Sequence, residues 1–144
     1  MSIVSTIYIE ATPEQVWRVL THFEAYPQWN PFIRSIKRTE LTPGARWKVR
    51  IQLPGGSAQT FRPTILKFVP AAELRWRGSL LIKGIFDGEH VFVIEPHATG
   101  SRFTQSERFS GLLALLIAPM IAAKTRRGFN EMNQSLKRIV ETKH

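Results

Sequence analysis

Three polar side chains fall on otherwise apolar strand faces in the second half of the chain. Residues 86–95 and 101–109 alternate in polarity like half-buried strands, which turns His90, Gln105 and Glu107 inward. Burying such groups unpaired costs about 1–3 kcal/mol each, so we expect them to pair with each other, with water or with a ligand. One interpretation is a polar anchor inside an apolar small-molecule site. The alternative is a purely structural His90–Glu107 pair, or a Glu107 that reaches solvent at a strand end.

A histidine beside a carboxylate could also move protons during a reaction. His90 and Glu107 are therefore the candidates for a general base and a general acid, although nothing else in the sequence indicates catalysis. The chain contains no cysteine, its four histidines are dispersed, and no Gly-Lys-Ser/Thr phosphate loop occurs. We therefore expect no metal site and no cofactor.

The elements that must position these residues can be read from periodicity and turn signals. Thr12-Pro13 is typical of a helix start, and Tyr26-Pro27 and Asn30-Pro31 end the helical segment that follows. The apolar residues of 125–143 recur with the spacing of a helix that has one buried stripe. The predicted strands cover residues 3–10, 33–40, 45–53, 59–69, 73–78, 86–95 and 101–109.

This order predicts an α+β fold: a strand, two short helices, six strands and a long C-terminal helix. A seven-stranded antiparallel sheet is too wide to stay flat, so we expect it to curl around the long helix. Residues 59–69 mix apolar and charged side chains on both faces, which a bulge near Pro63 would explain. A chain of 144 residues should form a single domain spanning residues 1–144.

The chain is basic, with 20 Lys and Arg against 11 Asp and Glu and a net charge of +9. Such a balance favours anionic partners. Arg75 and Arg77, however, map to the outer face of a strand and are not interleaved with exposed aromatic residues, so we do not expect nucleic-acid binding. The N-terminus lacks the features of a signal peptide, so the expected location is cytoplasmic.

Several motifs resemble the polyketide cyclase/dehydratase and lipid-transport branch of the START-like superfamily. They are residues 7–17 (IYIEATPEQVW), 26–31 (YPQWNP), 88–92 (GEHVF), 100–105 (GSRFTQ) and 128–133 (GFNEMN), and together they span nearly the whole chain. The resemblance implies a helix-grip fold, in which the long helix closes a curved sheet over an apolar cavity. The superfamily includes ligand carriers, hormone receptors, cyclases and co-chaperones, so the fold does not fix the function.

In a fold of this kind the core and the cavity wall share residues, so strand alternation indicates which side chains could meet a ligand. In residues 45–53 the expected inward set is Trp47, Val49, Ile51 and Leu53. Trp29 is a candidate for the cavity rim, and Gly128 is a point at which the long helix could yield for ligand entry. The candidate ligand-binding residues are Trp29, Trp47, Trp76, His90, Phe92, Phe103, Gln105, Glu107, Phe129, Met132 and Leu136.

The apolar run that begins at residue 111 has two interpretations. It can form the buried first turns of the long helix, started or kinked at Pro119. It can instead be a flexible lid that covers the cavity or touches a membrane when a lipid is exchanged, in which case Lys124, Arg126 and Arg127 suit an anionic surface. A transient membrane contact would then involve residues 111–127.

The sequence thus predicts a protein that binds a small, largely hydrophobic ligand of lipid, polyketide or aromatic type in an internal cavity. The first alternative is a cyclase- or dehydratase-type enzyme that uses His90 and Glu107 in the same cavity. The second is a co-chaperone-like interaction protein that uses its basic outer face. The sequence does not identify a protein partner.

Overall fold

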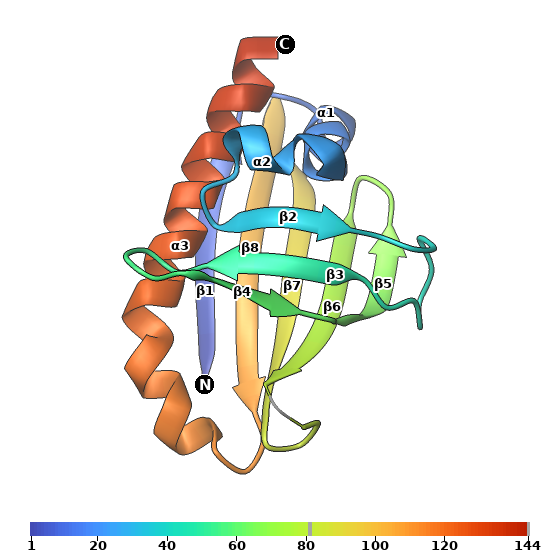
Figure 1. The fold of residues 1–144 in the computed structure, drawn as a ribbon. Coiled ribbons are helices and arrows are strands. Elements are labelled where there is room, and N and C mark those ends of the chain that lie inside the picture. Colours follow the sequence, from blue (N-terminus) through green and yellow to red (C-terminus); the bar gives the residue numbers. More distant parts are fainter. Residues whose placement is uncertain (81, 144) are drawn as a thin grey trace.

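The computed structural model describes residues 1–80 and 82–143, with the side chain of Leu80 left out. Its helices and strands follow the predicted order, with short helices near the start of the chain and a long helix at the end (Figure 1). In chain order they are β1 (Ser2–Ile9), α1 (Pro13–Leu20), the 3-10 turn η1 (Phe23–Ala25), α2 (Tyr26–Trp29), β2 (Ile33–Lys37), β3 (Lys48–Gln52), β4 (Ala58–Phe61), β5 (Thr64–Val69), β6 (Glu73–Leu80), β7 (Phe86–His97), β8 (Gly100–Ser110) and α3 (Ala114–Lys143).

The strands form two antiparallel sheets instead of the single seven-stranded sheet that the sequence predicts. Hydrogen bonds order one sheet as β1-β8-β7-β6-β5 and the other as β2-β3-β4, with an isolated bridge between Arg46 and Thr64. The predicted strand 59–69 divides into β4 and β5 around Pro63. Proline has no N–H to donate and restricts the residue before it, so it ends one strand and lets the chain change sheets. In Figure 1 the three shorter strands run across the face of the longer ones.

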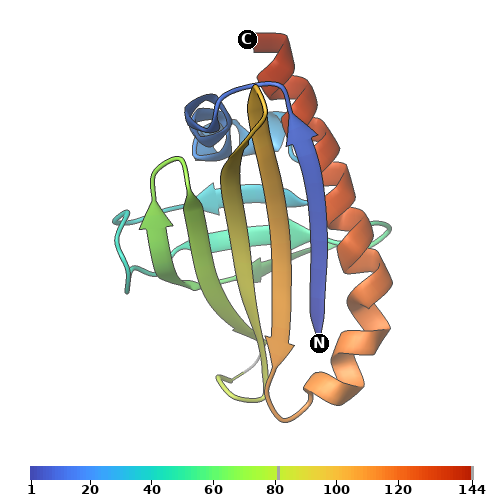
Figure 2. The same cartoon turned by 180° about the vertical axis from the view of Figure 1, so that it is seen from behind.

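Helix α3 runs beside β1 for most of the length of that strand and closes one side of the space between the two sheets (Figure 2). Its predicted stripe is confirmed, because Phe129, Met132, Leu136 and Val140 are all buried. The helix nevertheless begins at Ala114 and not near residue 125. The apolar run is therefore helical from Ala114 onward, including Pro119, but its outer face is not buried.

Gly128 lies where α3 comes closest to the chain that leads into β2. A Cβ atom at this position would lie 2.4 Å from Cδ1 of Phe32, whose ring packs edge-on against Phe129. Helix α3 continues without a break through Gly128. The absence of a side chain at this position therefore has a packing reason.

The start of α1 confirms the predicted cap. The Thr12 hydroxyl accepts a hydrogen bond from the Gln15 N–H (3.2 Å), and the Gln15 side-chain carbonyl accepts one from the Thr12 N–H (2.9 Å). Among the helices of the described residues, none is long and apolar enough to cross a membrane.

Candidate functional site

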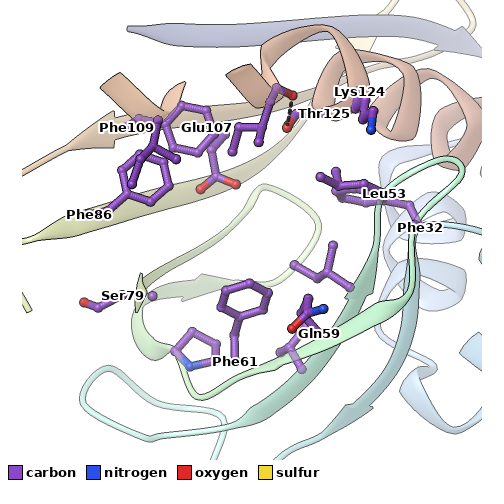
Figure 3. A pocket seen from close by; sticks show the side chains of 18 of the residues that line it. Phe32, Leu53, Gln59, Phe61, Ser79, Phe86, Glu107, Phe109, Lys124 and Thr125 are labelled. Atoms are coloured by element: carbon purple, nitrogen blue, oxygen red, sulfur yellow. Dashed lines mark hydrogen bonds between the residues drawn. The ribbon is translucent and has the colours of Figure 1, made fainter. Parts of the chain in front are cut away.

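A cavity of about 460 Å³ lies between the two sheets and the N-terminal half of α3. Most of its wall is apolar, and five of the lining side chains are aromatic. Figure 3 shows side chains from both sheets and from α3 converging on this space. The aromatic residues of the wall are Phe32, Phe61, Trp76, Phe86 and Phe109.

Solvent-exposed residues mark where the cavity opens. Ser57 and Gln59 lie in and after the turn between β3 and β4, and Lys124 lies on α3; all three are exposed and line the cavity. The turn between β3 and β4 reaches across to α3 in Figure 1. The opening therefore lies between that turn and the middle of α3.

Glu107 is the carboxylate of the cavity wall, and Figure 3 shows it projecting into the space. Its Oε1 lies 3.3 Å from Nδ1 of His90, and its side chain is 14% exposed whereas His90 is fully buried. The carboxylate passes over Gly88 of the neighbouring strand, where a Cβ atom would lie 2.6 Å from Oε2. The Glu107 carboxylate can occupy this position only because residue 88 is a glycine.

The other side of the His90 ring belongs to a chain of hydrogen bonds that leads to α3 and β1. Its Nε2 lies 2.8 Å from the Gln105 side-chain carbonyl, and the Gln105 amide donates to Asn133 Oδ1 at 2.9 Å. Asn133 in turn donates from Nδ2 to the Ser5 hydroxyl at 3.0 Å, and Ser5 donates to Asn130 on the surface. His90 and Gln105, which were expected to pair with each other, with water or with a ligand, are thus paired inside the core.

This chain fixes where hydrogen atoms can be. Asn133 Nδ2 also faces the backbone carbonyl of Ser5 at 3.5 Å, and a carbonyl can only accept. The Gln105 carbonyl therefore points at His90, so Nε2 of His90 carries a hydrogen. The contact between Nδ1 and Glu107 then requires one proton, held either by Glu107 beside a neutral His90 or by His90 beside an ionised Glu107. In both cases the pair is electrically neutral.

A second carboxylate, Asp87, is flanked in sequence by the wall residues Phe86 and Gly88 and holds the loop between β6 and β7. The Ser79 hydroxyl, itself part of the cavity wall, donates to Asp87 Oδ1 at 2.7 Å, and the Gly84 N–H lies 3.1 Å from both carboxylate oxygens. The hydrogen bond from Ser79 lowers the pKa of Asp87, and the N–H of Gly84 and the charges of Arg77 and Lys83 act in the same direction, while burial opposes them.

Of the residues predicted to meet a ligand, the structure places Trp76 and Glu107 on the cavity wall. His90 lies directly behind Glu107. Trp29 packs against Tyr26 at the far end of the molecule, and Trp47 is buried between other aromatic rings. The remaining predicted residues fill the core beyond the cavity instead of lining it: Phe92, Phe103, Gln105, Phe129, Met132 and Leu136.

Other wall residues were not among the candidates. The inward set predicted from alternation includes Val49, Ile51 and Leu53, and all three line the cavity. Ile117 and Ile121 come from the apolar run before the predicted helix start, and their spacing of four is the signal that could have revealed them. Phe61 and Ser79 carried no such signal, because the break between β4 and β5 and the length of β6 were not readable.

The family model described as "Polyketide cyclase / dehydrase and lipid transport" matches residues 1–141. No curated protein matches the sequence.

Solved structures share the fold at low sequence identity. A START superfamily protein from Mycobacterium smegmatis superposes with a TM-score of 0.77 at 17% identity, covering 99% of both chains. Protein CV1439 from Chromobacterium violaceum gives 0.73 at 19% identity and covers 97% of both chains. The di-domain ARO/CYC StfQ from the steffimycin biosynthetic pathway gives 0.72 at 14% identity, covering 99% of this chain and 51% of its own. At such identities the likeness shows the fold alone.

Proposed function

Because the chain belongs to the polyketide cyclase/dehydrase and lipid transport family, we propose that it binds a small, largely hydrophobic molecule in the cavity between the two sheets and α3. The volume of about 460 Å³ lies within the range of small-molecule sites. The aromatic wall favours a ligand that contains rings, since aromatic groups gain from edge-to-face contacts.

The observation that carries this proposal is the single carboxylate in an apolar wall. Glu107 offers an acceptor to the cavity, and its partner His90 keeps the pair neutral overall. A neutral pair gives no compensation to a second charge brought into an apolar space, and Lys124 lies exposed at the opening, not among the apolar residues of the wall. The ligand expected here is therefore uncharged, with one hydroxyl or comparable donor that reaches Glu107.

The proposal can be tested with 2-naphthol and 2-methylnaphthalene, which differ in one hydroxyl group. NMR titration should shift the indole N–H signal of Trp76 on the cavity wall and leave that of Trp29 in place. The hydroxyl should make 2-naphthol bind about tenfold more tightly, since a hydrogen bond to an uncharged acceptor contributes about 0.5–1.5 kcal/mol and one to an ionised acceptor about 1.5–3 kcal/mol.

The matched variants are Glu107→Leu and, on the outer face, Glu95→Leu. Glu107→Leu should bind both probes with similar affinity, whereas Glu95→Leu should keep the preference for 2-naphthol. If neither probe moves the Trp76 signal, the cavity does not bind ligands of this kind.

A second candidate function, acid–base catalysis of the cyclase or dehydratase type, is favoured by the contact between Glu107 and His90. In the state with protonated His90, the Glu107 carboxylate could remove a proton from a carbon flanked by carbonyl groups, leaving an enolate and a neutral carboxylic acid. Glu107→Gln should then abolish turnover of a poly-β-carbonyl substrate while its binding survives. Turnover that survives Glu107→Gln would leave the cavity with a binding role.

A further inference from the structure

The first turns of α3 expose an unusual group of large apolar side chains. Leu112, Leu115, Leu116 and Met120 are 82%, 92%, 69% and 78% exposed, and Ile82 in the loop between β6 and β7 is 69% exposed. We call these five residues the α3 tip. The two segments are joined, because the Leu112 N–H donates to the Gly84 carbonyl at 2.9 Å. Both views place them at the same end of the molecule (Figures 1 and 2).

The same helical turns are apolar on their inner side as well. Ile117 and Ile121 line the cavity, and Ala118 is fully buried. A helix that is apolar all round is normally buried on every side. The outer face of these turns is therefore a surface that a partner should cover.

The charges around the α3 tip select the kind of partner. Lys83 follows Ile82, and Lys124, Arg126 and Arg127 lie on the next turns of α3, while no Asp or Glu occurs between Glu107 and Glu131. In the part of the chain that the structure describes, no carboxylate lies within 4.0 Å of the three α3 cations. The apolar tip is thus bordered by free positive charge.

A second copy of this chain is disfavoured at this surface, because it would bring two cationic borders together on a chain of net charge +9. The tip is formed by the protruding end of a helix and a neighbouring loop, and such a shape can enter a flat, deformable surface. Leucine, isoleucine and methionine suit the boundary between headgroups and acyl chains, and lysine and arginine suit phosphate groups.

We propose that the α3 tip docks on the surface of an anionic lipid bilayer. The five apolar side chains enter the interface, and Lys83, Lys124, Arg126 and Arg127 contact the headgroups around them. This docking does not depend on the proposed ligand, since the docking residues lie outside the cavity wall, apart from Lys124 at the opening.

Co-sedimentation with vesicles tests the proposal. The wild-type protein should pellet with phosphatidylcholine vesicles that contain about a quarter phosphatidylglycerol, and not with pure phosphatidylcholine; about 0.5 M NaCl should weaken this binding. The double variant Leu115→Ser/Leu116→Ser should lose at least about tenfold in partition coefficient, because two exposed leucines no longer enter the interface.

Val4→Ser/Val69→Ser removes two exposed apolar side chains elsewhere and should pellet like the wild type. Equal binding of the leucine variant and the wild type to anionic vesicles would overturn the proposal. So would a wild-type dimer in light scattering that the leucine variant converts to a monomer, since the tip would then be a contact between copies. Naphthol binding in solution, measured on the same variants, separates a failure here from a failure of the ligand-binding proposal.

Discussion

Two glycines show how single positions set the geometry of the site and the core. At Gly88 an added Cβ would meet the end of the Glu107 side chain, and at Gly128 it would meet the ring of Phe32. The end of a glutamate can move at little cost, but a buried ring held by Phe129 cannot. Substitution by alanine should therefore affect mainly ligand preference at Gly88 and mainly stability at Gly128.

Gly88→Ala should change the ligand preference and leave stability nearly intact. The new methyl group displaces the Glu107 carboxylate, so the roughly tenfold preference for 2-naphthol over 2-methylnaphthalene should fall to about twofold or less. The free energy of unfolding in urea should change by less than about 1 kcal/mol. An unchanged preference would mean that Glu107 does not contact the hydroxyl group.

Gly128→Ala should lower the free energy of unfolding by about 1–3 kcal/mol, because the methyl group cannot fit beside Phe32. Alanine is otherwise favoured over glycine inside a helix by about 1 kcal/mol, so a net loss reports the clash. Adding Phe32→Leu to this variant should recover part of the loss. A stability gain in the single variant would show that α3 and Phe32 separate easily.

At the scale of elements, the loop between β6 and β7 is held by Asp87. Because its folded pKa lies below its ordinary value of 3.8, the ionised carboxylate stabilises the fold above that pH, and the contribution is lost as the pH falls through the lower folded pKa. Urea unfolding should show wild type more stable than Asp87→Asn at about pH 7, with the difference shrinking below about pH 3.8. A difference that stays constant down to about pH 2.5 would contradict this role.

Element order and strand faces were predictable, because alternation and helical spacing follow directly from the backbone geometry. Val49, Ile51 and Leu53 turn inward as expected, and the stripe of α3 is buried. The crossing from one sheet to the other at Pro63 appeared in the sequence only as a mixture of apolar and charged side chains on both faces of residues 59–69. The alternation of side chains indicates which face of a strand is buried, but not which strand lies next to it.

The position of the cavity was less predictable than the fold. Phe92 and Phe103 share the inward sheet face with Glu107 and Trp76, and Phe129 belongs to the buried stripe of α3. All three nevertheless meet each other or other buried side chains and fill the space at their end of the sheet. Whether an inward face becomes core or cavity wall depends on how side-chain volumes add up across two sheets and a helix. The alternation of side chains along one strand carries no information on this total volume.

At the scale of the whole molecule, the positive charges are neutralised on one surface and, among the described residues, left without a nearby carboxylate on another. On the outer face of the larger sheet, Arg75 and Arg77 pair with Glu89 at 2.8 and 3.4 Å. In those pairs the opposite charges compensate each other, whereas in the described part of the chain no carboxylate lies within 4.0 Å of Lys124, Arg126 or Arg127. An anionic surface is therefore expected to approach the end of the molecule where α3 begins.

The same turns of α3 line the cavity with their inner face and carry the α3 tip on their outer face, so ligand binding and membrane docking take place next to each other. If both proposals hold, a hydrophobic ligand passes from the bilayer into the cavity through the opening beside Lys124 on the same helix, and docking should speed its transfer between membranes. With a fluorescent ring-containing alcohol carried by anionic donor vesicles, the wild-type protein should transfer it to acceptor vesicles at least about tenfold faster than Leu115→Ser/Leu116→Ser. Both proteins should bind the alcohol equally in solution, because the substituted leucines do not line the cavity. Val4→Ser/Val69→Ser should transfer at the wild-type rate, and equal rates for all three proteins would show that ligand exchange takes place through solvent.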